Sequence, residues 1–126
     1  MTQDLKYRCK HYVNQLGIEG SSDALHALIE LPNDAIPILM CLYYEQHDSG
    51  IRGDIVHSIW QHRCQDSKDW LLEILKNEEH EEIWQEALDG LMTLGVKHEL
   101  SSISIDSPRK TRFIKEAIEL LEQGYA

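Results

Sequence analysis

Residues 54–59 read DIVHSI, and the same pattern returns as DALHAL at 23–28, EALDGL at 86–91 and EAIELL at 116–121. Each copy has an acidic residue, two small or aliphatic residues, two variable residues and a final aliphatic residue. The acids stand at positions 23, 54, 86 and 116, so the pattern repeats every 30 to 32 residues. A fixed period of this length is the sequence signature of stacked structural repeats. The spacing therefore predicts an array in which each repeat contributes one such segment.

Helix signals run along the whole chain. The apolar residues at 51, 55, 56, 59 and 60, for example, are spaced for one face of a helix. Ser21 or Ser22 and Asp34 are candidate N-caps, and Gly95 is a candidate C-cap. We predict helices over 5–16, 22–31, 34–46, 51–62, 67–76 and 79–94, a short irregular helix within 96–106, and a last helix that starts at Ser107-Pro108 and ends before Gly124.

Short loops pair these helices as hairpins, and the second helix of each pair carries the repeated pattern. No single hairpin can cover its own apolar face, whereas stacked neighbours bury a continuous core between them. We therefore predict an all-α fold, namely a short right-handed α-solenoid of stacked helical hairpins that forms a single domain over 1–126. Trp60 and Trp84 fall on the apolar stripe and are expected in the core, while Trp70 is expected to be half exposed.

The chain is acidic, with 22 acidic and 12 basic residues among 126 and a formal net charge of −10. This balance opposes nucleic-acid binding, which requires a basic surface. It favours a basic protein partner, although solubility alone would also explain it. Three basic residues, Arg109, Lys110 and Arg112, form a small patch that we expect to be a solvated helix start.

The cellular setting is expected to be the cytoplasm. The first ten residues contain no apolar signal core, and the longest apolar run, 35–44, is too short to cross a membrane. The three cysteines, Cys9, Cys41 and Cys64, match no disulfide or metal framework, so reduced thiols are expected. Cys41 is expected to be buried within the apolar run, and Cys9 to be more exposed.

Residues 35–39 (AIPIL) followed by 51–56 (IRGDIV) resemble a HEAT repeat, with its Ala-Ile-Pro-x-Leu opening helix and Val-Arg-x-x-Ala-like second helix. The next unit, 68–95, keeps the hydrophobic frame but lacks the proline and has Trp84 in place of the arginine. The resemblance covers 22–95 well and the termini loosely. It implies a HEAT-like scaffold or inhibitor that binds proteins, and it supplies no catalytic residues.

Short, acidic helical repeats of this size also resemble immunity proteins encoded beside bacterial toxin domains. We therefore expect a module that masks a basic partner, most concretely an immunity protein that neutralises a cognate toxin such as a nuclease. A different function class, an adaptor or regulatory scaffold in a larger assembly, remains open. It would require an exposed apolar patch at one end of the stack.

The repeated acids are the candidate site. They share one helical phase, and packed helices lie about 8–10 Å apart, so their carboxylates would form a ladder. The ladder thickens over 78–89, where few basic residues are near in sequence. The expected partner-binding residues are Asp54, His57, Glu78, Glu79, Glu82, Glu86 and Asp89, with Tyr44 as an exposed aromatic anchor. Alternatively, the acids belong to the repeat itself and pair with basic groups between layers.

Enzymatic motifs are missing from the sequence. There is no HExxH, no CxxC, no Gly-x-Ser-x-Gly and no glycine-rich phosphate loop. The pairs His80-Glu81 and His98-Glu99 are similar to those of the HEAT-like di-iron hydroxylase that acts on deoxyhypusine. Here, however, only two pairs exist, 18 residues apart rather than one period apart. We expect no enzymatic activity, no cofactor and no metal, and keep a HEAT-like metal-dependent enzyme as the remaining alternative.

Overall fold

The computed structural model describes residues 2–18 and 22–124, which form eight α-helices and one 3-10 helix. The helices are α1 (Thr2–Leu16), α2 (Ser22–Glu30), η1 (Asn33–Ala35), α3 (Ile36–Glu45), α4 (Ser49–Trp60), α5 (Gln65–Asn77), α6 (Glu81–Leu94), α7 (Lys97–Ser102) and α8 (Pro108–Glu122). No strand occurs within these two ranges. The predicted all-α class is confirmed.

Local chemistry sets three of the described helix ends. Gly95 ends α6 in the left-handed conformation, at φ 72° and ψ 38°, as predicted. Ser107 caps α8, because its Oγ accepts the Lys110 N–H at 3.3 Å, and Pro108 follows in the first turn. Asp48 lies in the loop before α4, and its carboxylate accepts the Ile51 N–H at 3.1 Å, so α4 starts at Ser49, two residues earlier than predicted.

Asp34 does not cap the third helix: it lies inside η1, and Ala35 precedes α3 without any side-chain cap bond. Ser21 lies outside the described residues, and Ser22 is the first residue of α2.

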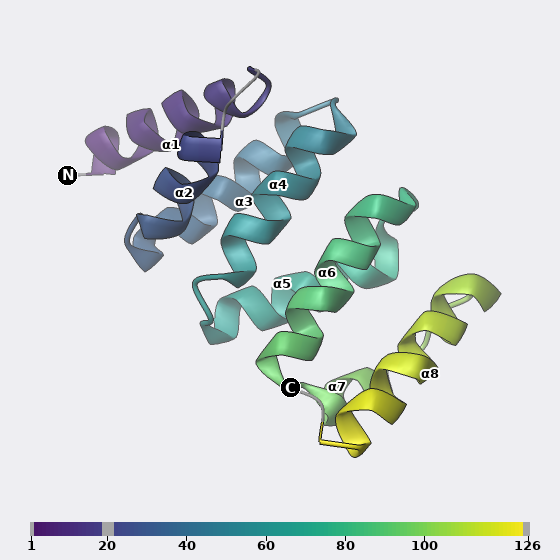
Figure 1. Ribbon diagram of the computed structural model, residues 1–126. Helices are drawn as coiled ribbons and strands as arrows, with labels where there is room; N and C mark the ends of the chain where they lie inside the picture. Colours follow the sequence, from purple (N-terminus) through teal and green to yellow (C-terminus); the bar gives the residue numbers. More distant parts are fainter. Residues whose placement is uncertain (1, 19–21, 125–126) are drawn as a thin grey trace.

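The helices that carry the repeated pattern pack on one another in chain order. α4 contacts both α2 and α6, and α6 contacts α8. Each also packs against the helix before it in the chain: α1 on α2, α3 on α4, α5 on α6 and α7 on α8. Figure 1 shows this succession, from α1 at one end of the molecule to α8 at the other.

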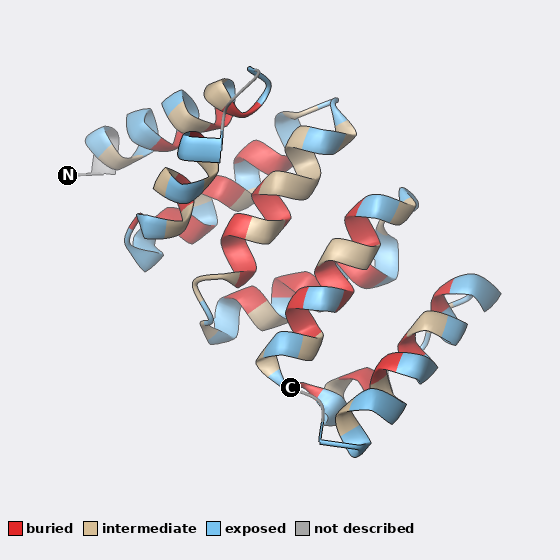
Figure 2. Cartoon of the chain, viewed as in Figure 1, coloured by how far each residue is buried: buried red, intermediate tan, exposed pale blue. Residues whose placement is uncertain are grey.

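The aliphatic positions of the repeated segment form the core. Leu28, Ile55, Ile59, Ala87 and Leu91 are fully buried. In Figure 2 the buried residues are most continuous along α4 and α6 and are sparser on α8. Trp60 and Trp84 are buried as predicted. Full burial of one such aliphatic side chain contributes about 1.5–3 kcal/mol, so the two central repeat helices hold the largest share of the core.

Three burial predictions are wrong. Cys9 is completely buried, because it lies four residues before Val13 and seven before Leu16 on the inner stripe of α1. Cys41 is exposed, since the apolar run of α3 is longer than one helical face can bury. Trp70 is only 9% exposed, and its ring packs edge-on against Tyr43 with centroids 5.1 Å apart.

The close contact between α4 and α6 depends on Gly90. A Cβ placed there would lie 2.5 Å from Cγ and 2.8 Å from Cβ of Trp60, which is buried and cannot move away easily. We expect Gly90→Ala to lower the free energy of unfolding by about 1–2 kcal/mol in urea titrations, because overpacking outweighs the better helix propensity of alanine.

Gly53 in α4 provides the matched control, since no atom lies within 4 Å of a Cβ built there. Gly53→Ala should leave the protein equally stable or stabilise it by up to about 1 kcal/mol. Equal stabilities for the two variants would contradict the close α4–α6 contact.

Candidate functional site

A cluster of charged side chains bridges α4 and α6. The carboxylate oxygen Oε2 of Glu86 lies 3.4 Å from Nδ1 of His57 and accepts the indole N–H of Trp60 at 3.1 Å. The rings of His57 and Trp60 meet edge-on, with centroids 5.0 Å apart. Two donors from α4 therefore hold one carboxylate of α6. The side chains of His57 and Glu86 remain 29% and 28% exposed, so the cluster can be reached from solvent.

Helical spacing brings further acids to the same place. Asp54 precedes His57 by three positions in α4, and Asp89 follows Glu86 by three in α6. Both carboxylates interact electrostatically with the His57–Glu86 pair. We call Asp54, His57, Glu86 and Asp89 the α4–α6 surface. These four predicted site residues, which occupy equivalent positions in the two central repeats, therefore lie close together.

The pKa values show how these charges interact. The hydrogen bond to Glu86 raises the pKa of His57, although burial opposes it. Burial would raise the pKa of Glu86, but the donors His57 and Trp60 outweigh it and lower that pKa. Burial, together with the charge of Glu86, raises the pKa of both Asp54 and Asp89. Three carboxylates surround one imidazole, which leaves an excess of negative charge.

Glu78 has a different role from the one expected. Its carboxylate accepts from Arg52 at 2.6 Å and from the Tyr43 hydroxyl at 3.0 Å. Its backbone carbonyl accepts the Lys110 ammonium. Arg52 also donates to the Tyr43 hydroxyl at 3.0 Å and lies over the Tyr43 ring. Glu78 therefore joins α3, α4 and α8 within the fold, and its charge is matched.

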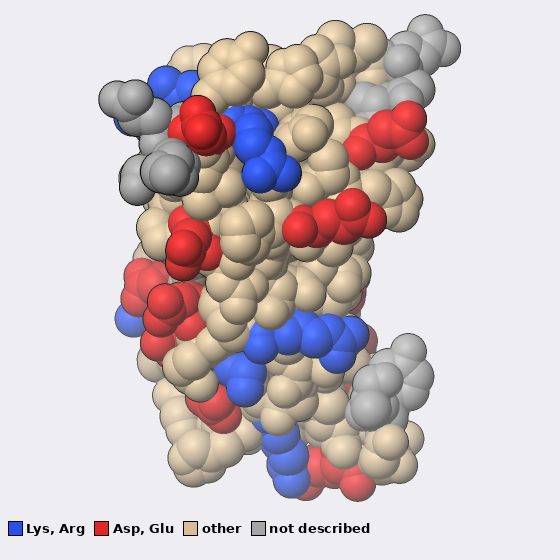
Figure 3. All heavy atoms as spheres, turned by 90° about the vertical axis from the view of Figure 1, so that its left-hand side faces the viewer, with Lys and Arg blue, Asp and Glu red and all other residues tan. Residues whose placement is uncertain are grey.

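Few basic residues are near the 78–89 acids in sequence, but distant segments supply basic partners to three of these acids. Arg52, His57 and Arg109 pair with Glu78, Glu86 and Glu81, each across 26 to 29 positions of sequence. Lys110 is 7% exposed, so it is not a solvated start to α8. Figure 3 shows acidic and basic side chains interspersed on one face of the molecule. On this face the acidic side chains do not form one continuous surface.

The other predicted site residues form no described hydrogen bond or ion pair with the α4–α6 surface, although Glu82 lies one turn before Glu86 on α6. Glu79 and Glu82 are exposed, and Glu79 acts electrostatically on Lys110. Tyr44 is 66% exposed, as an anchor would be, and its ring contacts that of Tyr43. No hydrogen bond, ion pair or ring contact described for residues 4–18 and 22–124 links Tyr44 to Asp54 or His57. The repeat acids Asp23 and Glu116 are exposed at the outer repeats.

Trp60 is the residue that sequence reasoning missed. The apolar stripe accounted for its ring but not for its N–H, which holds Glu86. The indole N–H is a donor that favours a hydrogen-bond acceptor when the ring is buried. Glu86, the acid of the next repeated segment, was the residue in the sequence that could have been predicted as this acceptor. Asp48 was likewise missed: it caps α4 and adds to the electrostatic field at Asp54.

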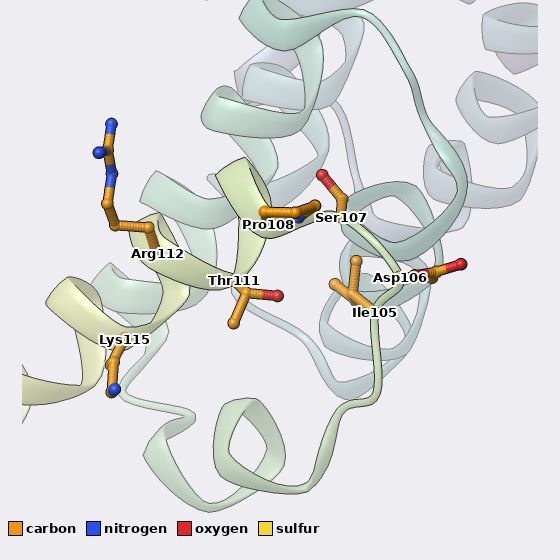
Figure 4. Close-up of a pocket in the computed structure, with 7 residues that line it drawn as sticks. All are labelled: Ile105, Asp106, Ser107, Pro108, Thr111, Arg112 and Lys115. Atoms are coloured by element: carbon orange, nitrogen blue, oxygen red, sulfur yellow. The ribbon is translucent and has the colours of Figure 1, made fainter.

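Surface hollows elsewhere are shallow and mixed in character. Figure 4 shows one of about 490 Å³ at the start of α8, lined by Ile105, Asp106, Ser107, Pro108, Thr111, Arg112 and Lys115. Its charged side chains are exposed. A second hollow beside it combines Lys76, Arg109 and Lys110 with Glu79, Glu81 and Asp106, so its charges largely compensate one another.

Metal ligands do not converge in the part of the chain that the structure describes: no three His, Cys, Asp or Glu side chains there could hold a metal ion. Of the His-Glu pairs, Glu81 is bound to Arg109. Among the same residues, no single helix has the length and apolarity to cross a membrane; only α2 and η1–α3 together do, and they are bent by 109°.

No family model, curated protein or solved structure matches this chain.

Protonation of His57 should make stability depend on pH. Because its pKa is raised in the folded state, its contribution is complete below the unfolded value of about 6.5 and is lost as the pH rises through the folded value. We expect the free energy of unfolding to fall by about 0.5–1 kcal/mol across this range, the size typical of partly exposed pairs.

Urea titrations of wild type and His57→Gln at several pH values would measure this loss. The variant should lose that part of the pH dependence. His26→Gln is the control, because His26 holds the same repeat position in α2 but is exposed. A wild-type slope that persists in His57→Gln would exclude His57 as its source.

The matched charge of Glu78 leads to a stability prediction. Glu78→Gln weakens the bonds to Arg52 and Tyr43 and leaves a partly buried guanidinium without its counter-charge, at a cost of about 1–3 kcal/mol. Glu79→Gln, one residue away and exposed, should stay within about 0.5 kcal/mol of wild type in thermal or urea unfolding. Similar losses in both variants would argue against the described network.

Proposed function

We propose that the protein is a binding module that masks a basic protein, and that the α4–α6 surface carries this contact. We propose that the fold that positions this surface is a short HEAT-like α-solenoid. Its support is the chain-order packing of α2, α4, α6 and α8, each covered by the helix before it. Such stacks present extended surfaces for protein partners.

The observation that carries the proposal is the unmatched charge at this surface. Burial and the charge of Glu86 raise the pKa of Asp54, which is partly buried, so ionising it costs free energy in the unbound protein. The same influences raise the pKa of Asp89, but Asp89 is exposed, so solvent screens most of the cost there. A lysine or arginine from a partner would relieve that cost and gain a charge-assisted hydrogen bond. Phosphate groups would be repelled, which excludes nucleic acid as the ligand of this surface.

The most concrete form of this function is that of an immunity protein. A toxin domain such as a nuclease has a basic active face, because it binds phosphates. A small protein with a net charge of −10 would be attracted to that face and would cover it. Opposite charges would mainly accelerate association and reject wrong partners.

The test compares wild type with Asp54→Asn/Asp89→Asn. Both proteins are immobilised, partners are captured from the native cell, and the partner retained is purified for binding kinetics. We expect a basic protein whose affinity for the variant is at least about tenfold lower, mostly through slower association, and whose binding depends less on salt.

The control is Asp23→Asn/Glu116→Gln, which removes two repeat acids that are exposed and outside the surface. It should bind like wild type. An acidic partner, or a partner that binds the Asp54→Asn/Asp89→Asn variant with unchanged affinity and salt dependence, would refute the proposal.

A further inference from the structure

A groove runs along α1, η1, α3 and α5, away from the residues of the α4–α6 surface. It consists of two adjoining hollows of about 980 Å³ and 380 Å³, which share Pro37 and Asp66. We call it the α1–α3–α5 groove. Its walls come from helices that carry none of the repeated segments, so none of the repeat acids lines it.

The lining of this groove is evenly mixed in the larger hollow and mainly apolar in the smaller one. Its apolar lining residues include Leu5, Ile36, Pro37, Ile38, Met40 and Trp70. Trp70 is 91% buried, given its exposed fraction of 9%. Its indole N–H is the one buried side-chain polar atom without a hydrogen-bond partner in the described residues. An unsatisfied buried donor costs free energy.

The rim of the groove is acidic. It carries five carboxylates, those of Asp4, Asp34, Asp66, Asp69 and Glu73, against one basic side chain, Arg8. All six side chains are exposed. No ion pair within residues 4–18 and 22–124 engages any of the five acids. The described hydrogen bonds give Asp69 and Glu73 only neutral amide donors, from Gln65 and Asn77.

This combination distinguishes the groove from the rest of the surface. Glu78, Glu81 and Glu86 have basic partners inside the fold, whereas the five rim acids do not. The hollows beside α8 contain arginine and lysine side chains, which are Arg112 and Lys115 in one and Lys76, Arg109 and Lys110 in the other. Apolar surface and unmatched negative charge therefore coincide at the α1–α3–α5 groove.

We propose that the α1–α3–α5 groove binds a basic amphipathic helix of a partner protein. Apolar side chains at helical spacing would enter the groove, and flanking lysines or arginines would meet the rim carboxylates. The proposal is independent of the α4–α6 surface, because the two share no residue.

The first test uses a dye-labelled synthetic peptide of about 14 residues, with leucines on one helical face and lysines on the other. Fluorescence anisotropy should show saturable binding. Asp66→Asn/Asp69→Asn/Glu73→Gln should weaken it at least about tenfold and reduce its salt dependence. The matched control, Asp23→Asn/Glu116→Gln/Glu119→Gln, removes the same charge from exposed sites on α2 and α8 and should bind within about twofold of wild type.

Two further experiments test the apolar contribution to peptide binding and locate the bound peptide. A peptide with the same lysines but with serine in place of leucine should bind at least about tenfold more weakly. In NMR spectra, the leucine–lysine peptide should shift the indole N–H signal of Trp70, identified from Trp70→Phe, and leave those of Trp60 and Trp84 in place.

Several results would overturn the groove proposal: no saturable binding, equal binding of the serine peptide, equal losses in both triple variants, or shifts confined to Trp60 or Trp84. The double variant Asp54→Asn/Asp89→Asn separates this proposal from the first. It should bind the leucine–lysine peptide like wild type, whether or not the α4–α6 surface recognises a partner.

Discussion

The close packing of α4 on α6 at Gly90 and Trp60 is the contact on which the rest of the structure depends. Because Gly90 has no side chain, the Trp60 ring lies directly against the backbone of α6. This position aims the indole N–H at Glu86, and Glu86 then faces His57. The same contact lies at the centre of the core, so stability and surface charge are set at one place. A displacement of α4 relative to α6 would disturb both.

Charge matching across distant segments is the second organising feature. Arg52, from α4, holds Glu78 at the end of α5, and Arg109, from α8, holds Glu81 at the start of α6. These pairs lie at the junctions between successive helix pairs. They neutralise acids that would otherwise repel one another in a protein with a net charge of −10. The acids without an ion pair among the described residues include Asp54 and Asp89 of the α4–α6 surface and the five acids at the rim of the α1–α3–α5 groove.

The two surfaces differ in the kind of recognition that their chemistry supports. The α4–α6 surface is polar, with carboxylates around one imidazole, and is suited to a single cationic side chain. The α1–α3–α5 groove combines apolar lining with an acidic rim and is suited to a longer amphipathic segment. In both proposals the partner is a basic protein. A large basic partner that engaged both surfaces at once would bind more tightly than through either surface alone, because the two contacts are linked.

Helix positions follow from local chemistry, which is why the sequence predicts them well. Gly95 ends α6 and Ser107-Pro108 starts α8, since these depend on backbone conformation and on side chains within one turn. The burial of Ile55, Ile59 and Leu91 likewise follows from the helical period. Errors appear where a helix is apolar on more than one face, as in α3, where Cys41 is exposed.

The sequence by itself thus determined the helices, the apolar frame and the phase that brings Asp54, His57, Glu86 and Asp89 onto facing helices. Only the tertiary structure decided which acids are neutralised, as with Glu78, and that the Trp60 N–H holds Glu86. The physical reason is that such pairs join residues 26 or more positions apart, across two packed helices. Their meeting depends on the rotation and distance between those helices, which a pattern along one helix does not encode.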